Sequence, residues 1–172
     1  MMRTSQAYIF CLDEHRNFSE EVRKRFSDTA KYKIFSSVTH IDFLRNLNDE
    51  NERHNCKVAI LTIYDGKEQG LLIENLTKEI KKNDPGTGLI LVFPAEKSDE
   101  IKKSVIFNID SYIPRNANTI LRLHNAVKKL ISEHSLEIYR RRRNMSVYIL
   151  LAFLLLSGVL FLVARLKLPV YF

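Results

Sequence analysis

The chain has 172 residues, of which 45% are hydrophobic and 27% are charged, and its formal net charge is +7. These proportions suit one folded domain with an apolar core plus a short further segment, and they exclude a chain too polar to fold. Residues 1–144 hold all 20 acidic and 25 of the 27 basic residues, a balance of +5 that falls to +1 without the run Arg140–Arg143. A nucleic-acid-binding domain shows a basic stripe of its own, so the charge predicts no nucleic-acid partner.

Short apolar runs alternate with longer amphipathic segments along residues 7–144. Strands are predicted over residues 7–12, 32–38, 57–63, 89–93 and 110–115. Helices are predicted over residues 17–30, 39–49, 70–83 and 98–108 and from residue 116 onward. Five strands alternating with five helices predict an α/β fold, a doubly wound five-stranded parallel sheet of the flavodoxin-like type.

The spacing of apolar residues predicts which side of each helix faces the sheet. In the first helix, Asn17 is the expected N-cap. The residues expected to face the sheet from the first three helices are Phe18, Val22, Phe26, Ile41, Leu44, Leu47, Leu72, Leu76 and Ile80.

The cysteines and histidines indicate no metal or disulfide framework. Cys11 falls inside the first predicted strand and Cys56 at the entry to the third, so the two are poorly placed to pair. We interpret them as buried free thiols of a reducing compartment. The five histidines are scattered without the spacing of a zinc site, and we expect neither a metal nor a cofactor.

Residues 145–164 contain no charge, and 20 helical residues span about 30 Å, the thickness of a bilayer's hydrocarbon. We expect the last helix to extend into a single C-terminal transmembrane helix, the alternative being an unusually apolar core helix. Within it, Ser157 and Gly158 form a small patch suited to close helix packing. The segment is flanked by basic residues: Arg140, Arg141, Arg142 and Arg143 before it, and Arg165 and Lys167 after it.

The predicted organisation is a domain over residues 1–131, a basic helical stalk over 132–144, the span over 145–164 and a short extracytoplasmic tail over 165–172. Basic residues beside a span prefer the cytoplasm. The N-terminus also lacks a hydrophobic signal region of the usual length. We therefore expect a single-pass protein of the inner (cytoplasmic) membrane, with its folded domain in the cytoplasm.

The segments "YIFCLDEH", "ILTIYDGKEQG", "LILVFPA" and "DSYIPRN" resemble the receiver domain of bacterial two-component response regulators, over about residues 7–131. The resemblance implies that Leu12 and Asp13 stand at the acidic pair and Thr62 at the phospho-accepting aspartate, eight residues before Gly70. It also places Phe93 at the Ser/Thr switch position, Tyr112 at the aromatic switch position and Arg115 at the lysine.

Phosphoryl transfer to a carboxylate needs that carboxylate, a Mg²⁺ held by further carboxylates, and a cation against the phosphoryl oxygens. Thr62 cannot form an acyl phosphate and Leu12 cannot bind a metal ion. Asp13 and Glu14 alone would bind Mg²⁺ weakly, and Arg115 is expected to form a salt bridge with Asp13. We interpret the site as degenerate: a pseudo-receiver. Less favoured are an occupied metal site, Asp65 as a substitute acid, and Thr62 as the target of a separate kinase.

The sequence thus predicts a non-catalytic, membrane-anchored pseudo-receiver that acts as an adaptor or regulatory subunit, and not an enzyme. Its expected partners are membrane protein subunits, a signalling kinase or both, with a homodimer left open. The resemblance implies an interaction face that includes Ile101, Val105 and Tyr112. The alternatives are a phosphorylation-responsive domain with an altered acidic site and, more remotely, a flavin or nucleotide binder.

Overall fold

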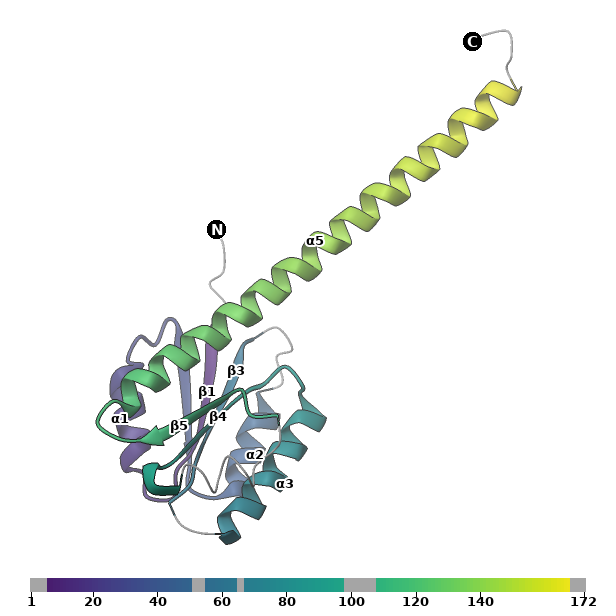
Figure 1. Cartoon of the computed structure of the whole chain (residues 1–172). Helices are drawn as coiled ribbons and strands as arrows, with labels where there is room; N and C mark the ends of the chain where they lie inside the picture. The colour runs from purple at the N-terminus through teal and green to yellow at the C-terminus, as the bar shows by residue number, and fades with distance from the viewer. Residues whose placement is uncertain (1–5, 51–54, 65–66, 98–107, 168–172) are drawn as a thin grey trace. The chain divides into compact units, whose positions relative to one another are not determined.

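Five parallel strands form one sheet in the order β2-β1-β3-β4-β5 (Figure 1). The computed structural model describes residues 6–50, 55–64, 67–97 and 108–167. The strands are β1 (Ala7–Leu12), β2 (Tyr32–Ser37), β3 (Lys57–Thr62), β4 (Gly88–Pro94) and β5 (Ser111–Arg115). Every residue of β1 and β3 is buried, as expected of inner strands covered on both faces.

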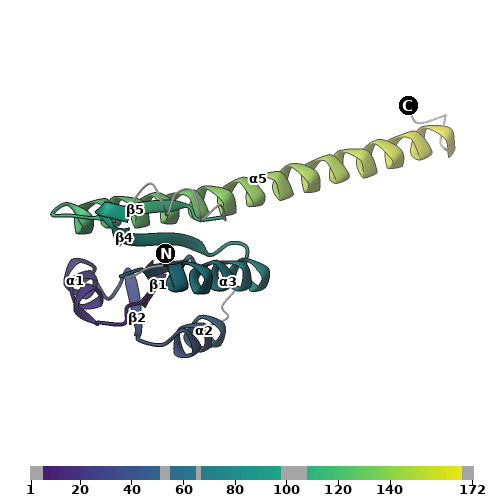
Figure 2. The same cartoon turned by 60° about the horizontal axis from the view of Figure 1, so that its bottom comes forward.

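Helices cover both faces of the sheet (Figure 2). They are α1 (Asn17–Arg25), α2 (His40–Asp49), α3 (Lys67–Asn83), the short 3₁₀ helix η1 (Ala95–Lys97) and α5 (Thr119–Lys167). Alternate strand residues pack against α2 and α3 on one face, and the residues between them pack against α1 and the first turns of α5 on the other. The doubly wound, flavodoxin-like fold is confirmed. The predicted helix over residues 98–108 falls, except for Asn108, outside the described residues.

Three predictions about the helices are wrong in detail. Ile41 is 60% exposed, whereas Phe43 and Leu47 are buried. Residues two apart lie about 200° apart around a helix, so Ile41 and Phe43 cannot both face the sheet. In α3 the inward residues are Ile73, Leu76 and Ile80, and Leu72 lies at the margin with 39% exposure.

Asn17 is the third: it is the first residue of α1 and not its N-cap. The cap position belongs to Arg16, whose φ of 61° is in the left-handed region and whose side chain makes no capping bond. The free amide of Ser19 instead donates to the carboxylate of Asp13. An acid from the preceding loop therefore performs the capping.

Both cysteines are buried and free. Burial raises the pKa of the Cys11 thiol to about 12, and that of Cys56 to about 12 as well. Thiols held in this protonated form are poor nucleophiles, as expected for cysteines that serve only as packing residues.

The chain divides into two units, Met1–His134 and Ser135–Phe172. In the second unit, α5 contains an 18-residue window with a mean hydropathy of 2.7. Its large apolar side chains from Met145 to Val163 are all exposed in the chain by itself. This makes α5 a candidate membrane span by length and composition.

Candidate functional site

The carboxyl ends of the strands bring the predicted site residues to one edge of the sheet, where ligands of open α/β folds usually bind. Thr62 ends β3 and is buried. Its hydroxyl donates a 2.7 Å hydrogen bond to the backbone carbonyl of Leu12, at the end of β1. The two side chains that replace acids in the receiver pattern thus belong to neighbouring strand ends, and the Thr62 hydroxyl is used to join them.

Asp13 is only 1% exposed, so it is not a solvated loop acid. Its Oδ2 accepts a 2.8 Å hydrogen bond from the backbone amide of Ser19, in the first turn of α1. Its Oδ1 accepts a hydrogen bond from the hydroxyl of Tyr64. A buried carboxylate is costly without partners, and here both of its oxygens are engaged by the protein itself.

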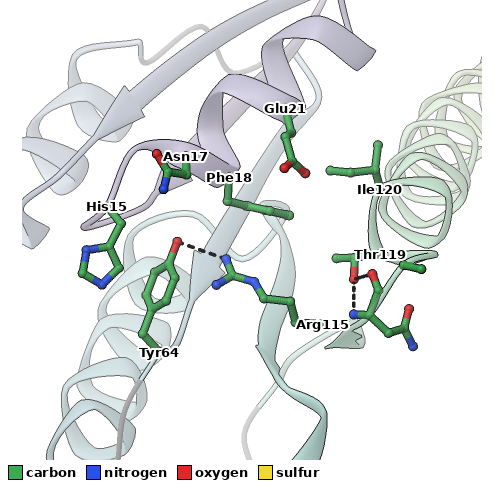
Figure 3. Close-up of a pocket in the computed structure, with 10 residues that line it drawn as sticks. His15, Asn17, Phe18, Glu21, Tyr64, Arg115, Thr119 and Ile120 are labelled. Carbon is green, nitrogen blue, oxygen red and sulfur yellow. Dashed lines mark hydrogen bonds between the residues drawn. The ribbon is translucent and has the colours of Figure 1, made fainter.

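The expected ion pair between Arg115 and Asp13 is wrong, because no such pair occurs among the described residues. Arg115 Nη2 instead donates a 3.0 Å hydrogen bond to the hydroxyl of Tyr64, which in turn donates to Asp13. The guanidinium carbon lies 4.2 Å from the centre of the Tyr64 ring and 5.3 Å from that of Phe18. Figure 3 shows the guanidinium directed at the tyrosine hydroxyl. The Tyr64 hydroxyl therefore lies between the carboxylate of Asp13 and the guanidinium of Arg115.

Tyr64 is the site residue that the sequence analysis missed. Burial raises the pKa of its phenol, the hydrogen bond to Asp13 raises it further, and the bond from Arg115 opposes them. The phenol accordingly remains a neutral donor at neutral pH. Its ring also meets that of His15 edge-on, with the ring centres 4.3 Å apart. Its position two residues past Thr62, at a strand's carboxyl end, was the available signal.

The side chains at this edge do not provide the ligands of a Mg²⁺ ion, which prefers several oxygen ligands in octahedral geometry. Leu12 offers no side-chain donor, the Thr62 hydroxyl faces the Leu12 carbonyl, and both Asp13 oxygens are already bonded. Glu14 is exposed. Among the described residues there is no cluster of three His, Cys, Asp or Glu side chains that could hold a metal ion. Asp65 lies outside the described residues.

The side chains of Phe93 and Tyr112 lie on the face of the sheet that α2 and α3 cover. Phe93 is fully buried in the core that packs against α2 and α3, and Tyr112 packs against that core while half-buried. Burial raises the pKa of the Tyr112 phenol. Phe93 provides packing at the position where the resemblance implies a hydroxyl. Ile101 and Val105, the other residues of the predicted interaction face, lie outside the described residues.

A cleft of about 510 Å³ opens between α1, the end of β5 and the start of α5 (Figure 3). Arg115 and Tyr64 form part of its wall, but Asp13 and Thr62 do not line it. Its lining residues are His15, Asn17, Phe18, Glu21, Tyr64, Arg115, Asn116, Ala117, Thr119 and Ile120. The cleft therefore lies beside the degenerate site, on the side of α1 and α5.

The predicted membrane residues all fall within α5. The side chains of Arg140 and Arg143 are exposed, and those of Arg141 and Arg142 are not described. Ser157 Oγ donates a 3.0 Å hydrogen bond to the carbonyl of Leu154, one turn back. A methyl group added at Gly158 would meet nothing within 4 Å.

Solved receiver domains share this fold. A response regulator receiver domain protein from Clostridium thermocellum has a TM-score of 0.60 and 18% identity, covering 76% of this chain and 98% of its own. A response regulator from Thermotoga maritima has a TM-score of 0.60 and 19% identity, covering 74% and 98%. The Thermotoga maritima response regulator TrrA, solved in complex with Mg(2+)-BeF, has a TM-score of 0.54 and 21% identity, covering 73% and 99%.

No protein-family model matches the chain, and no curated protein matches it. At identities of 18–21% the structural similarity concerns the fold alone. What it shows is that the five-stranded domain has the fold of response regulator receiver domains.

Proposed function

We propose that this chain is a receiver-like signalling domain that does not accept a phosphoryl group. In this proposal it acts as a membrane-anchored adaptor or regulatory subunit of a membrane protein complex and is not an enzyme. The receiver fold supports a signalling role, and the side chains at its carboxyl edge support a role without phosphoryl chemistry.

One observation carries the proposal: the Tyr64 hydroxyl lies between Asp13 and Arg115 and bonds to both. Phosphoryl transfer to a carboxylate needs carboxylates that are free to hold Mg²⁺ and a cation that is free to contact the phosphoryl oxygens. Here the carboxylate and the cation are joined through a phenol, and the acceptor position is Thr62, whose hydroxyl is bonded to Leu12. The residues support a closed, fixed surface better than a site that binds Mg²⁺ and a phosphoryl group.

The apolar part of α5 supports membrane anchoring. A core helix of this length would bury its apolar side chains, but those from Met145 to Val163 are exposed in the chain by itself. A lipid bilayer is the environment that an uncharged helix of this length fits. Anchoring would raise the effective concentration of the domain for membrane partners.

The test of the phosphoryl part uses the full chain in detergent with acetyl phosphate, or with beryllofluoride, in the presence of Mg²⁺. We expect no change in mass and no change in the amide spectrum, whereas TrrA, whose structure contains Mg(2+)-BeF, serves as the positive control. A stoichiometric, Mg²⁺-dependent adduct on the native chain would overturn the proposal in favour of a phosphorylation-responsive domain.

The test of the anchoring uses a reporter that is active only outside the cytoplasm. We expect activity when it is fused after Phe172 and silence when it is fused before Met1, because the four arginines Arg140–Arg143 outnumber Arg165 and Lys167. The reverse pattern would invert the orientation. Mass spectrometry of proteins that co-purify with the full chain in detergent then identifies the partner subunits or kinase.

A further inference from the structure

Ion pairs are unevenly distributed over the described part of the domain. On the side of α2 and α3 and at the amino ends of the strands, cations are matched with acids. The pairs are Lys31–Asp28, Lys33–Glu50, Arg45–Asp42, Lys57–Asp84, Lys78–Glu74 and Lys81–Asp110. By contrast, no residue of α1 takes part in an ion pair with any described residue, and α5 contains one pair, Lys129–Glu133.

Arg25, near the end of α1, and His124 and Lys128, in the first turns of α5, lie close together. Arg25 Nη2 lies 3.5 Å from His124 Nδ1, within hydrogen-bonding distance. The His124 ring also packs against Phe26, with ring centres 5.4 Å apart. Burial lowers the pKa of His124, and the charges of Lys128 and Arg25 lower it further. Arg25 and Lys128 thus place two positive charges beside His124, and the three residues are here called the α1–α5 cluster.

The nearest acid on α1 does not neutralise the α1–α5 cluster. Glu21 lies four residues before Arg25, a spacing that commonly gives an ion pair on a helix. The two nevertheless form no ion pair in the described structure, and Glu21 lines the cleft beside Ile120. The cluster is therefore a surface charge that the described part of the domain leaves without an acidic partner.

An exposed apolar residue adjoins this charge. Leu121, His124 and Lys128 follow one another at spacings of three and four, so they share one side of α5. Leu121 is 53% exposed, and Arg25 and Lys128 are exposed as well. A surface that combines an apolar contact with cations is typical of protein recognition, in which an apolar centre is rimmed by complementary charge.

We propose that the α1–α5 cluster together with Leu121 is a docking surface for an acidic segment of a partner protein. The inference rests on the proposed adaptor function and specifies which face the partner uses and which chemistry it carries. The expected partner segment presents Asp or Glu side chains to Arg25 and Lys128 and an apolar side chain to Leu121. Nucleic acid is less favoured because the domain apart from Arg140–Arg143 carries only +1, too little for a basic stripe.

The test measures binding of a fluorescently labelled oligoglutamate peptide to the full chain in nanodiscs of uncharged lipid. The test variant is Arg25→Glu with Lys128→Glu. The matched control is Arg45→Glu with Lys82→Glu, which makes the same charge change at exposed positions of α2 and α3. We expect salt-sensitive binding by the native chain, weakened about tenfold in the test variant and changed less than about twofold in the control.

Equal losses in the two variants, or no saturable binding by the native chain, would overturn the docking surface. It would also be overturned if anionic vesicles or a DNA duplex bound more tightly than oligoglutamate and lost more binding in the test variant, because the surface would then serve lipid or nucleic acid. A circular dichroism melt of each variant shows that the fold is kept. Co-purification of membrane partners with the native full chain in detergent is measured separately, so failure of the docking surface is distinguishable from failure of the adaptor function.

Discussion

The hydroxyl of Thr62 donates a hydrogen bond to the backbone carbonyl of Leu12, across the carboxyl ends of β3 and β1. The donor must be a group that carries a hydrogen, because a carbonyl only accepts. The position that would hold a phospho-accepting carboxylate in a receiver thus faces an acceptor in this chain. A carboxylate placed at residue 62 would therefore lose this hydrogen bond and face the carbonyl oxygen instead.

Replacing Thr62 with Asp is expected to destabilise the domain and to leave it insensitive to phosphodonors. An ionised carboxylate would face the Leu12 carbonyl without a donor, and such a buried group costs about 1–3 kcal/mol or more. Thr62→Asn is the matched control, since its amide can still donate. Chemical denaturation followed by circular dichroism compares the two. An Asp variant as stable as the Asn variant, or one that accepts a phosphoryl group, contradicts this account.

Replacing Tyr64 with Phe removes the hydroxyl that bonds to both Asp13 and Arg115. One oxygen of a buried carboxylate then loses its donor, so we expect the free energy of unfolding to fall by about 1–3 kcal/mol. Tyr139→Phe, at a position that is 58% exposed, is the control and should have little effect. Equal stability of the Tyr64→Phe and native proteins would show that water replaces the hydroxyl at no cost.

The α1–α5 cluster predicts a pH dependence. The pKa of His124 lies below its ordinary value of 6.5, so the unfolded chain binds this proton more readily than the folded one. The contribution of the neutral His124 to the stability of the fold is therefore fully present above pH 6.5 and declines as the pH falls below that value. In an NMR titration of the imidazole, Lys128→Ala should raise the pKa of His124, whereas Lys129→Ala, which removes the partner of Glu133, should leave it unchanged. A pKa of His124 at or above 6.5 in the native chain would contradict the cluster.

Helix α5 comprises Thr119–Lys167, and insertions within it test how the domain is presented to a membrane partner. One alanine inserted between His134 and Ser135 turns a continuous helix by about 100° and should weaken co-purification of that partner. Seven inserted residues, close to two turns, should largely restore it. A flexible glycine-serine insertion should act like the single alanine. If all three insertions leave binding intact, the helix is only a tether.

The sheet could be predicted because each of its inner strands is recognisable from a short stretch of sequence. β1, β3 and β4 are short apolar runs bounded by polar or turn residues, and burial on both faces requires that composition. The inward side of α2 was only partly predictable, since Ile41 and Phe43 compete for one face and the spacing alone does not decide between them.

The sequence was sufficient to predict which chemical groups of a receiver site are missing, but not which hydrogen bonds the remaining residues make. Leu12, Thr62 and Phe93 cannot perform the chemistry of the residues they replace, and that follows from residue type. The bonds of Asp13 depend on the return of the chain after β3 and on the first turn of α1, which bring Tyr64 and Ser19 to it. Arg115 is the retained cation by residue type, but its partner is Tyr64, a position to which the resemblance assigns no role.

The enclosed phenol has a spectroscopic consequence. The chain contains seven tyrosines and no tryptophan, so the change in its near-ultraviolet absorbance at alkaline pH reports the ionisation of the tyrosines. Burial raises the pKa of Tyr64 and of Tyr112 above the usual 10.0, and these two phenols should ionise after exposed ones. Opening of the contact between Tyr64, Asp13 and Arg115, whether by denaturant or by a bound partner, can therefore be followed in the unlabelled protein as a rise of near-ultraviolet absorbance at a lower pH.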